Sequence, residues 1–273
     1  METIMLNEQN LEYWQRQSDR NVIALGFFDG IHKGHQEVIK TAGRKAEELG
    51  ASLAVMSFFP HPKTVLSNGD VAFDYLMPLE EKAQVLRSLG VDRFYIVSFN
   101  KSFASLSPED YVNQYLLQFG TIHAVAGYDF SYGFKGAGNI DRLEEDAGGR
   151  IGTTKVGKVE YRGRKISSTW IRELIAEGNV EELPQLVGRL YEVKGQWNGD
   201  SLEAFSCYML PAPGCYTATV KTKDDIIMTN VCVEHLQNRI YFPADSEVRC
   251  QVGDEVSVTL RHQVREGAVY AYS

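Results

Sequence analysis

The sequence predicts an α/β domain built on a parallel sheet, followed by a small all-β, barrel-like domain. Between residue 21 and about residue 190, apolar runs of strand length alternate with helical patterns. A strand, a helix and a strand in succession imply a right-handed crossover between parallel strands. From residue 192 onwards, short β-rich runs separated by turns replace that alternation, as in an antiparallel barrel or sandwich. We therefore expect two domains, residues 1–187 and 188–273.

Length, charge and the first residues exclude several classes of protein. The 273 residues suffice for one large domain or two ordinary ones. A net charge of -8 argues against a general nucleic-acid binder, and it means that an anionic substrate needs a locally positive pocket. No apolar run approaches the roughly 20 residues that span a bilayer, and METIMLNEQN lacks the basic and apolar regions of a secretory signal. We expect a cytoplasmic protein with neither nucleic-acid nor membrane partners.

The first predicted strand and the helix after it enclose the most informative stretch of the chain. Residues 1–20 predict no element, whereas residues 22–25 form an apolar run that leads into GFFDGIHKGH. His32 and His35 stand three residues apart where a helical pattern begins, and imidazoles there can donate hydrogen bonds to phosphoryl oxygens. One histidine alone would favour a surface turn, but the pair, following a strand and a glycine-rich turn, favours a phosphate site.

The second predicted strand, residues 52–58, is nearly all apolar, as expected for a parallel strand covered on both faces. It runs into FFPHPKTVL, where Pro60 and Pro62 predict an extended, rigid exit. Parallel sheets keep their sites in the loops at the carboxyl ends of the strands. His61 is therefore either a substrate contact or a solvent-facing residue between two prolines.

Two more strands and two helices complete the predicted sheet domain. Residues 79–89 predict a helix and residues 93–98 a third strand. Ser107 and Pro108 predict the N-cap and the first position of the next helix. The fourth strand, residues 122–126, ends in a glycine-rich loop, which predicts either a segment that wraps a ligand or a flexible hairpin connection.

The segment KISSTWIRELIAEGNV predicts a helix that ends near Gly178. Hydroxyl side chains before a helix are most often caps, and Ser167, Ser168 and Thr169 have that place here. Arg172 follows at helical spacing and projects from the same side of the first turn. Free N–H groups, hydroxyls and a guanidinium on one face form an anion site suited to a triphosphate.

Three motifs in order resemble those of a known family. GFFDGIHKGH, residues 26–35, resembles the signature of the HxGH nucleotidyltransferases. GYDFSYG, residues 127–133, fits the G-x-D/N-F-x-F/Y-G segment of the FAD synthetase module in bacterial bifunctional riboflavin kinase/FMN adenylyltransferases. ISSTWIR, residues 166–172, matches the I-S-S-T-x-I-R pattern of that module at every fixed position. The resemblance extends from about residue 20 to Tyr191 and implies a Rossmann-like domain that converts ATP and FMN into FAD and pyrophosphate.

The resemblance also implies a role for particular residues. It places His32, His35 and Arg172 in catalysis. It implies ATP contacts from Gly26, Phe27, Asp29, Gly30, Gly34, Gly127, Asp129, Gly133, Ser167, Ser168 and Thr169. FMN contacts are expected from Phe59, His61, Phe130 and Tyr132. Mg²⁺ is expected to bridge phosphate oxygens with few protein ligands, and no protein ligand is certain, since Asp29 is either an indirect metal contact or a turn-forming residue.

The barrel-like domain departs from the family pattern. A riboflavin kinase module carries a G-R-x-L-G-F-P-T-A-N segment near its start, but this chain reads GQWNGDSLEAFSCYMLPAPGCYTATV and contains no PTAN. APGCYTATV resembles the P-x-G-V-Y segment, so the barrel is expected to persist, some tens of residues shorter than a full kinase module. Glu234 and Glu266 are available carboxylates, although surface positions are the commoner explanation. We expect no kinase activity.

The cysteines predict neither a zinc site nor a disulfide framework. Cys207, Cys215, Cys232 and Cys250 lie in the last quarter of the chain without CxxC spacing. We expect buried free thiols.

Three alternatives to a monofunctional FAD synthetase remain open. One is the full bifunctional enzyme, which the missing PTAN disfavours. Another is a catalytically silent flavin or nucleotide sensor. The third is a nucleotidyltransferase acting on pantetheine phosphate or glycerol phosphate, which the GYDFSYG and ISSTWIR motifs together disfavour.

Overall fold

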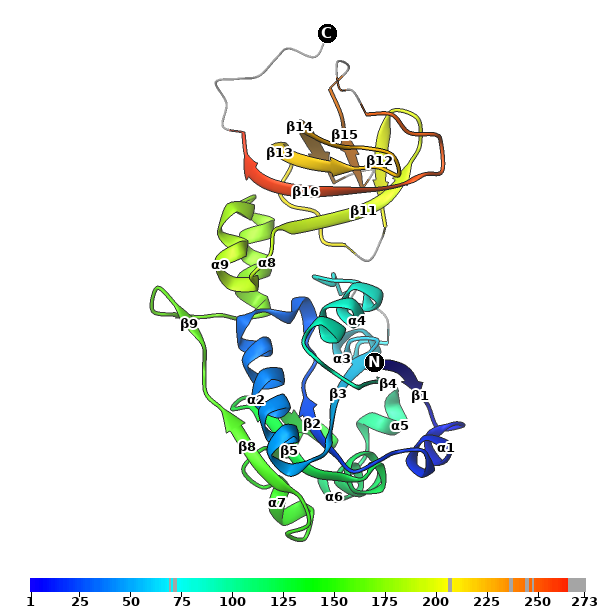
Figure 1. Ribbon diagram of the computed structural model, residues 1–273, viewed down its shortest axis with the longest axis vertical. Helices are drawn as coiled ribbons and strands as arrows, with labels where there is room; N and C mark the ends of the chain where they lie inside the picture. The colour runs from blue at the N-terminus through cyan, green and yellow to red at the C-terminus, as the bar shows by residue number, and fades with distance from the viewer. Residues whose placement is uncertain are drawn as a thin grey trace. The chain divides into compact units, whose positions relative to one another are not determined.

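In the computed structural model, the chain forms two compact units (Figure 1). Unit 1 consists of residues 1–73 and 79–165, and unit 2 of residues 74–78 and 166–273. The structure describes residues 1–68, 70, 73–205, 208–235, 238–243, 246 and 248–264. Cys207 and Glu266 lie outside these residues. Within them, no helix has the length and apolar character needed to cross a bilayer.

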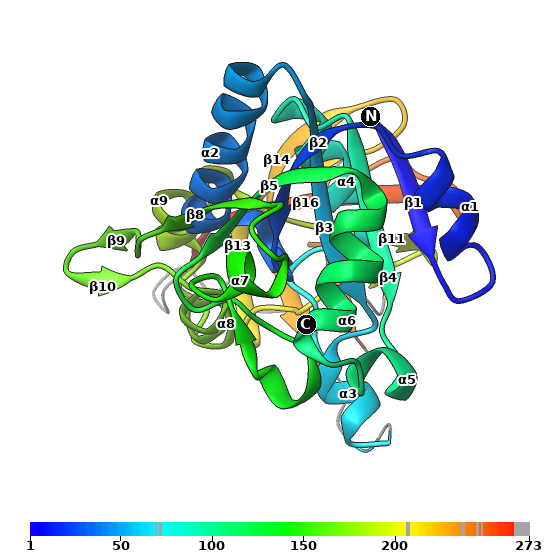
Figure 2. The same cartoon turned by 90° about the horizontal axis from the view of Figure 1, so that it is seen from below.

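Unit 1 contains a six-stranded parallel sheet in the order β1-β4-β3-β2-β5-β8. Its strands are β1 (Glu2–Leu6), β2 (Asn21–Leu25), β3 (Ser52–Phe59), β4 (Arg93–Ser98), β5 (Thr121–Gly127) and β8 (Gly152–Val156). Four of them match the predicted strands, so the parallel α/β fold is confirmed. The two strands at opposite edges of the sheet, β1 and β8, were not predicted (Figure 2).

The helices of unit 1 connect these strands. They are α1 (Leu11–Arg16), α2 (Lys33–Leu49), α3 (Pro62–Leu66), α4 (Leu79–Ser88), α5 (Lys101–Ala104), α6 (Pro108–Tyr111) and α7 (Leu143–Asp146). Three 3-10 turns, η1 (Asp29–Ile31), η3 (Leu117–Phe119) and η4 (Phe134–Gly136), and one π-helical turn, η2 (Val112–Leu116), complete the set. Two small hairpins are formed by β6 (Ser131–Tyr132) with β7 (Gly138–Asn139), and by β9 (Glu160–Tyr161) with β10 (Arg164–Lys165).

The strand order places helices on both faces of the sheet. From β2 the chain moves to β3 and β4 on one side, and then returns to β5 on the other side of β2. Right-handed crossovers therefore put α2 and α4 on one face and α6 on the opposite face. Figures 1 and 2 show α2 running beside β2 and β5. On the opposite face, Tyr111, Tyr115 and Phe119 pack with strand residues such as Ile23 in the main hydrophobic core.

Local signals set several of the helix ends. Gly50 ends α2 in the left-handed conformation, with φ of 57°. Ser107 accepts a hydrogen bond from the Asp110 N–H and Pro108 occupies the first turn of α6, which confirms the predicted cap. The predicted extended exit from the second strand is wrong beyond His61, because α3 begins at Pro62. Proline suits the first helical position, where its missing N–H has no intrahelical partner.

Unit 2 contains the predicted barrel, closed in the order β11-β12-β15-β14-β13-β16. Its strands are β11 (Tyr191–Trp197), β12 (Ser201–Ala204), β13 (Gly214–Lys221), β14 (Ile226–Glu234), β15 (Arg239–Tyr241) and β16 (Glu255–Gln263). Before the barrel come α8 (Ser168–Ala176), η5 (Val180–Glu182) and α9 (Leu183–Val187). Along β13, the buried residues Tyr216, Ala218 and Val220 alternate with more exposed ones, as in a strand with one face in a core.

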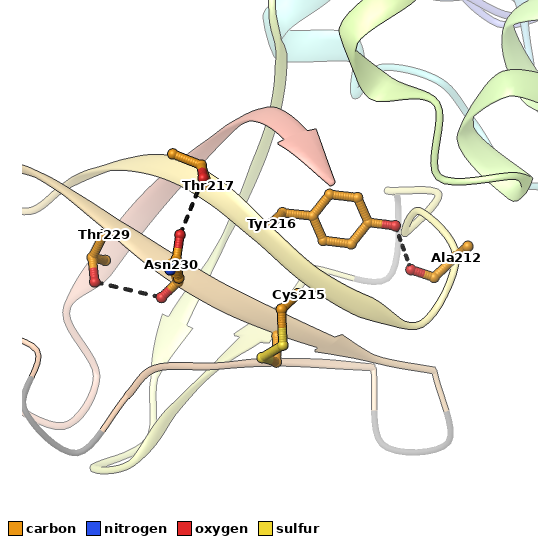
Figure 3. The surroundings of a disulfide bond; sticks show 7 residues. Ala212, Cys215, Tyr216, Thr217, Thr229 and Asn230 are labelled. Carbon is orange, nitrogen blue, oxygen red and sulfur yellow. Dashed lines mark hydrogen bonds between the residues drawn. A yellow bond between two sulfur atoms is a disulfide. The ribbon is translucent and has the colours of Figure 1, made fainter. Parts of the chain in front are cut away.

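Two cysteines in the barrel form a disulfide, so the prediction of free thiols is wrong for them (Figure 3). Cys215 on β13 lies directly opposite Cys232 on β14, with their Cα atoms 4.0 Å apart, and the two are bonded. Sequence spacing did not indicate this pairing, because it depends on the register of a hairpin rather than on a short motif. Cys250 is free and half-buried.

Candidate active site

The sheet topology brings together the motifs that follow β2 and β5. Leu25 pairs with Ala126 in register, so the GFFDGIHKGH turn and the GYDFSYG loop leave the sheet as neighbours at its carboxyl edge. This is the point where the strand order reverses, and open α/β sheets bind ligands there. The carboxyl end of β3, with Phe59 and His61, follows on the other side of β2.

The turn after β2 has an unusual backbone. Phe28, Gly30 and Ile31 have φ of 53°, 74° and 38°, and a positive φ at a bulky or β-branched residue is a true outlier. A Cβ on Gly26 would lie 3.0 Å from the Phe28 ring, so glycine leaves room for that ring where it folds back. Strain of this kind persists only where the surroundings hold it, and it occurs often at functional sites.

This turn delivers the two histidines to the start of α2. His32 is the N-cap residue, and its Nδ1 accepts a hydrogen bond from the His35 N–H at 3.2 Å. The two rings are stacked, with centroids 3.6 Å apart and planes 16° apart. Since Nδ1 of His32 is an acceptor, the proton of its neutral ring sits on Nε2. His32 therefore offers one N–H donor away from the helix.

Both histidines are neutral near pH 7. Burial, reinforced by the charge of Lys165, lowers the pKa of His32 to about 4. Burial also holds the pKa of His35 well below its ordinary value, with further contributions from His32, Lys82 and Lys165. Nδ1 of His35 is buried without a hydrogen-bond partner in the part of the chain that the structure describes. A neutral pair with an unused ring nitrogen can bind an anion through N–H donors without itself losing a proton.

Asp129, in the loop after β5, forms an ion pair with Lys165 on β10. Lys165 donates a hydrogen bond to the Asp129 carboxylate at 2.5 Å, and its Nζ lies 4.7 Å from the centroid of the Tyr128 ring. The same lysine acts on the pKa of both His32 and His35. Lys165 is therefore a cation, paired with Asp129, whose charge acts on both histidines. No sequence pattern had singled out Lys165, although it directly precedes ISSTWIR.

Lys82 on α4 is a second cation at this site that the sequence analysis missed. Its side chain is buried, and its Nζ donates a hydrogen bond to the backbone carbonyl of Phe27 at 3.0 Å. One signal could have found it, because Leu79, Lys82 and Leu86 share one helical face at spacings of three and four. A lysine on the apolar face of a helix is rarely buried without a partner.

The residues expected to contact FMN lie in different surroundings. The His61 ring stacks on Phe73 with centroids 3.6 Å apart and meets the Phe27 ring edge-on at 4.5 Å, beside the β2 turn. Phe130 packs against the main core. Tyr132 lies within that core, and its hydroxyl donates to Asp146. The burial of Tyr132 supports a packing role, and its contact with FMN stays a prediction.

Gly133 has a packing reason of its own. Its φ is 73°, and a Cβ there would lie 2.9 Å from the backbone nitrogen of Pro108. Gly34 lies in the first turn of α2, between the two histidines.

The ISSTWIR segment starts α8 in unit 2. Ser167 is the N-cap, and its hydroxyl accepts a hydrogen bond from the Trp170 N–H at 3.2 Å. Ser168 and Thr169 form the first turn. Arg172 donates from Nε to the backbone carbonyl of Asp74 at 3.2 Å. A capping role for Ser167 is therefore established, and the anion site built on this turn stays a prediction.

A family model described as FAD synthetase matches residues 14–170. The bifunctional riboflavin kinase/FMN adenylyltransferase of Listeria monocytogenes is 40% identical over 243 residues, which cover 85% of this chain and 76% of that protein. The enzyme of the same name from Bacillus subtilis is 45% identical over 176 residues, and the match covers 64% of this chain and 56% of that protein. The chain thus spans little more than half the length of the Bacillus relative.

Two further proteins, one compared by sequence and one by structure, resemble this chain. An FAD synthetase of Listeria monocytogenes is 32% identical over 198 residues, covering 71% of this chain and 79% of that protein. A crystal structure of a protein named macrolide-efflux protein, from Streptococcus pneumoniae, matches with a TM-score of 0.84 at 26% identity. That match covers 100% of this chain and 94% of the other, so the likeness includes the barrel.

Proposed function

Because the chain belongs to the FAD synthetase family, we propose that it transfers the adenylyl group of ATP to FMN, giving FAD and pyrophosphate. The observation that carries this proposal is the neutral, stacked pair His32 and His35, which a strained turn presents at the reversal point of the sheet. Lys165 lies close enough to change the pKa of both rings. A phosphate-binding site needs such donors and such a charge.

The reaction requires alignment more than activation. A phosphate oxygen of FMN attacks the α-phosphorus of ATP, the new P–O bond forms, and the bond from that phosphorus to the bridging oxygen breaks. The electron pair leaves with pyrophosphate, so no covalent enzyme intermediate and no strong base are needed. In this proposal, His32 and His35 donate hydrogen bonds to the ATP phosphates as negative charge moves onto the leaving group. Neutral imidazoles perform this task without a change of protonation state.

The remaining motifs are assigned to the same two substrates. We place the adenosine against the loop of residues 127–133 with Asp129. Ser168, Thr169 and Arg172 are assigned to the β- and γ-phosphates, since a helix start with hydroxyls and a guanidinium suits a triphosphate. We assign the flavin ring to the aromatic cluster in which His61 stacks on Phe73 and Phe27 meets both rings edge-on, since aromatic rings pair in these geometries.

Mg²⁺ enters this proposal as the companion of ATP. Within the residues that the structure describes, no group of three or more histidine, cysteine, aspartate or glutamate side chains is placed to hold a metal. Phosphate oxygens and water supply most ligands of Mg²⁺ in many nucleotide sites, and Asp29 is the one carboxylate buried in the β2 turn. The ion would neutralise phosphate charge, while the protein residues orient the two substrates.

The proposal is tested by incubating the purified protein with ATP and FMN and separating the flavins. We expect FAD and pyrophosphate in equal amounts. Unchanged FMN, with ATP intact, would contradict the proposal. FMN bound without turnover would instead favour a flavin sensor.

A conservative substitution tests the role of Arg172. Arg172→Lys is expected to raise KM for ATP at least about tenfold while KM for FMN stays nearly constant, because a lysine cannot grip two phosphate oxygens as a guanidinium does. Steady-state kinetics with each substrate varied in turn provide the measurement. Arg44→Lys is the matched control, since Arg44 is an exposed residue of α2 that pairs with Glu37. An effect confined to FMN would mean that α8 is assigned to the wrong substrate.

A further inference from the structure

Lys82 makes two contacts with one residue of the β2 turn. Its Nζ donates to the Phe27 carbonyl at 3.0 Å and lies 5.0 Å from the centroid of the Phe27 ring. Ser57 on β3 donates to the same carbonyl at 2.7 Å. The carbonyl of Phe27, which directly precedes the positive-φ residue Phe28, is therefore held by donors from two different elements. Its orientation sets how the chain enters the turn.

A charge at this position is costly and is retained all the same. Lys82 is 1% exposed, and Asp29 in the same turn is also 1% exposed. Burial lowers the pKa of Lys82 to about 8, and the nearby charge of Asp29 opposes that shift. Burying a lysine ammonium group is strongly unfavourable unless the group is paired and hydrogen-bonded. Lys82 on α4 and Asp29 in η1 are buried opposite charges that stabilise each other. The hydrogen bond to the Phe27 carbonyl stabilises the Lys82 ammonium group further.

The strained residues lie between these contacts and the histidines. Phe28, Gly30 and Ile31 adopt positive φ values in the few residues that separate Phe27 from His32. Such a backbone reverts to a relaxed conformation unless neighbouring groups hold it. α4, the helix that carries Lys82, packs against η1. The turn is thus anchored at one end by Lys82 and continues at the other end into the His32 cap of α2.

We propose that Lys82 is a positioning residue: through the Phe27 carbonyl and Asp29 it holds the residue 27–31 turn in the conformation that presents His32 and His35 to the phosphates. The proposal rests on the proposed function for its catalytic consequence. It assigns no contact between Lys82 and substrate. Lys165, in contrast, lies on β10 and pairs with Asp129.

Lys82→Met tests this role, because methionine keeps an unbranched apolar stem and removes the donor and the charge. We expect kcat for FAD formation to fall about 10²-fold, as a misplacement of about 1 Å does, while KM for ATP and FMN changes by less than about threefold. Lys82→Gln keeps an amide donor without the charge and is expected to lose about tenfold in kcat. This second variant serves if Lys82→Met does not fold.

Leu86→Ala is the matched control, since Leu86 is fully buried on the same helix and carries no polar group. It should lower thermal stability while leaving kcat within about threefold of the parent. A similar loss of kcat in Leu86→Ala, or unchanged kcat in both Lys82 variants, would overturn the proposal. An inactive parent protein would instead overturn the proposed function.

A readout independent of activity separates the two proposals further. In NMR spectra of histidine-labelled protein without substrate, the ring signals of His32 and His35 should move in Lys82→Met. They should stay in place in Leu86→Ala. Unmoved signals in a folded Lys82→Met protein would contradict the positioning role whether or not the protein makes FAD.

Discussion

His32→Ala and His35→Ala are each expected to lower the turnover of FAD formation about 10²-fold or more, as removal of one donor to a developing charge does elsewhere. A loss of that size corresponds to about 3 kcal/mol of transition-state stabilisation. The two rings are stacked and joined by the bond from the His35 N–H to His32 Nδ1. Because they act as one unit, the double variant should lose less than the product of the two single losses.

The measurement must separate lost chemistry from a damaged helix. His32 caps α2 through its ring nitrogen, so His32→Ala is also expected to cost about 1 kcal/mol of stability. His32→Asn keeps a side-chain cap without the imidazole and should retain stability but remain as slow as His32→Ala. His123→Ala is the control, because the His123 ring on β5 forms a hydrogen bond with the Thr154 hydroxyl. Near-normal FAD formation in the double variant would remove the central assignment of the site.

The sequence was sufficient for elements whose signals are local. An apolar run, a capping serine or a C-terminal glycine reports on its own few residues, and Ser107 and Gly50 act as such signals predict. Parallel strands were also predictable, because successive strand-helix-strand units imply them. The strand order was not predicted, and only the structure shows that the motifs following β2 and β5 are neighbours.

The features that the sequence concealed depend on partners far along the chain. β1 pairs with β4, which lies about 90 residues away, and its five residues ETIML are too short a run to predict that pairing. Lys82 and the Phe27 carbonyl meet only after the sheet forms. The bond between Cys215 and Cys232 depends on hairpin register. Each case is a tertiary contact that overrides what the local composition suggests.

The last prediction concerns the barrel and needs no substitution. With riboflavin and ATP, the protein is expected to form neither FMN nor FAD, while FMN and ATP in the same buffer should give FAD. The reason lies in the chain between β12 and β14, where residues 201–234 contain no PTAN segment. In a kinase of this family, that segment is expected to place a metal against the γ-phosphate of ATP and the ribityl hydroxyl of riboflavin.

Separation of flavins and measurement of ADP decide between the two forms of the enzyme. The bifunctional relative from Listeria monocytogenes, 40% identical to this chain, is the positive control for riboflavin phosphorylation in the same assay. Steady conversion of riboflavin to FMN, with an equal amount of ADP, would show that the barrel has built a kinase site from other side chains. The closed barrel offers carboxylates such as Glu234 on β14 for such a site. Because riboflavin phosphorylation is assigned to the barrel, this outcome leaves the assignment of His32 and His35 unaffected.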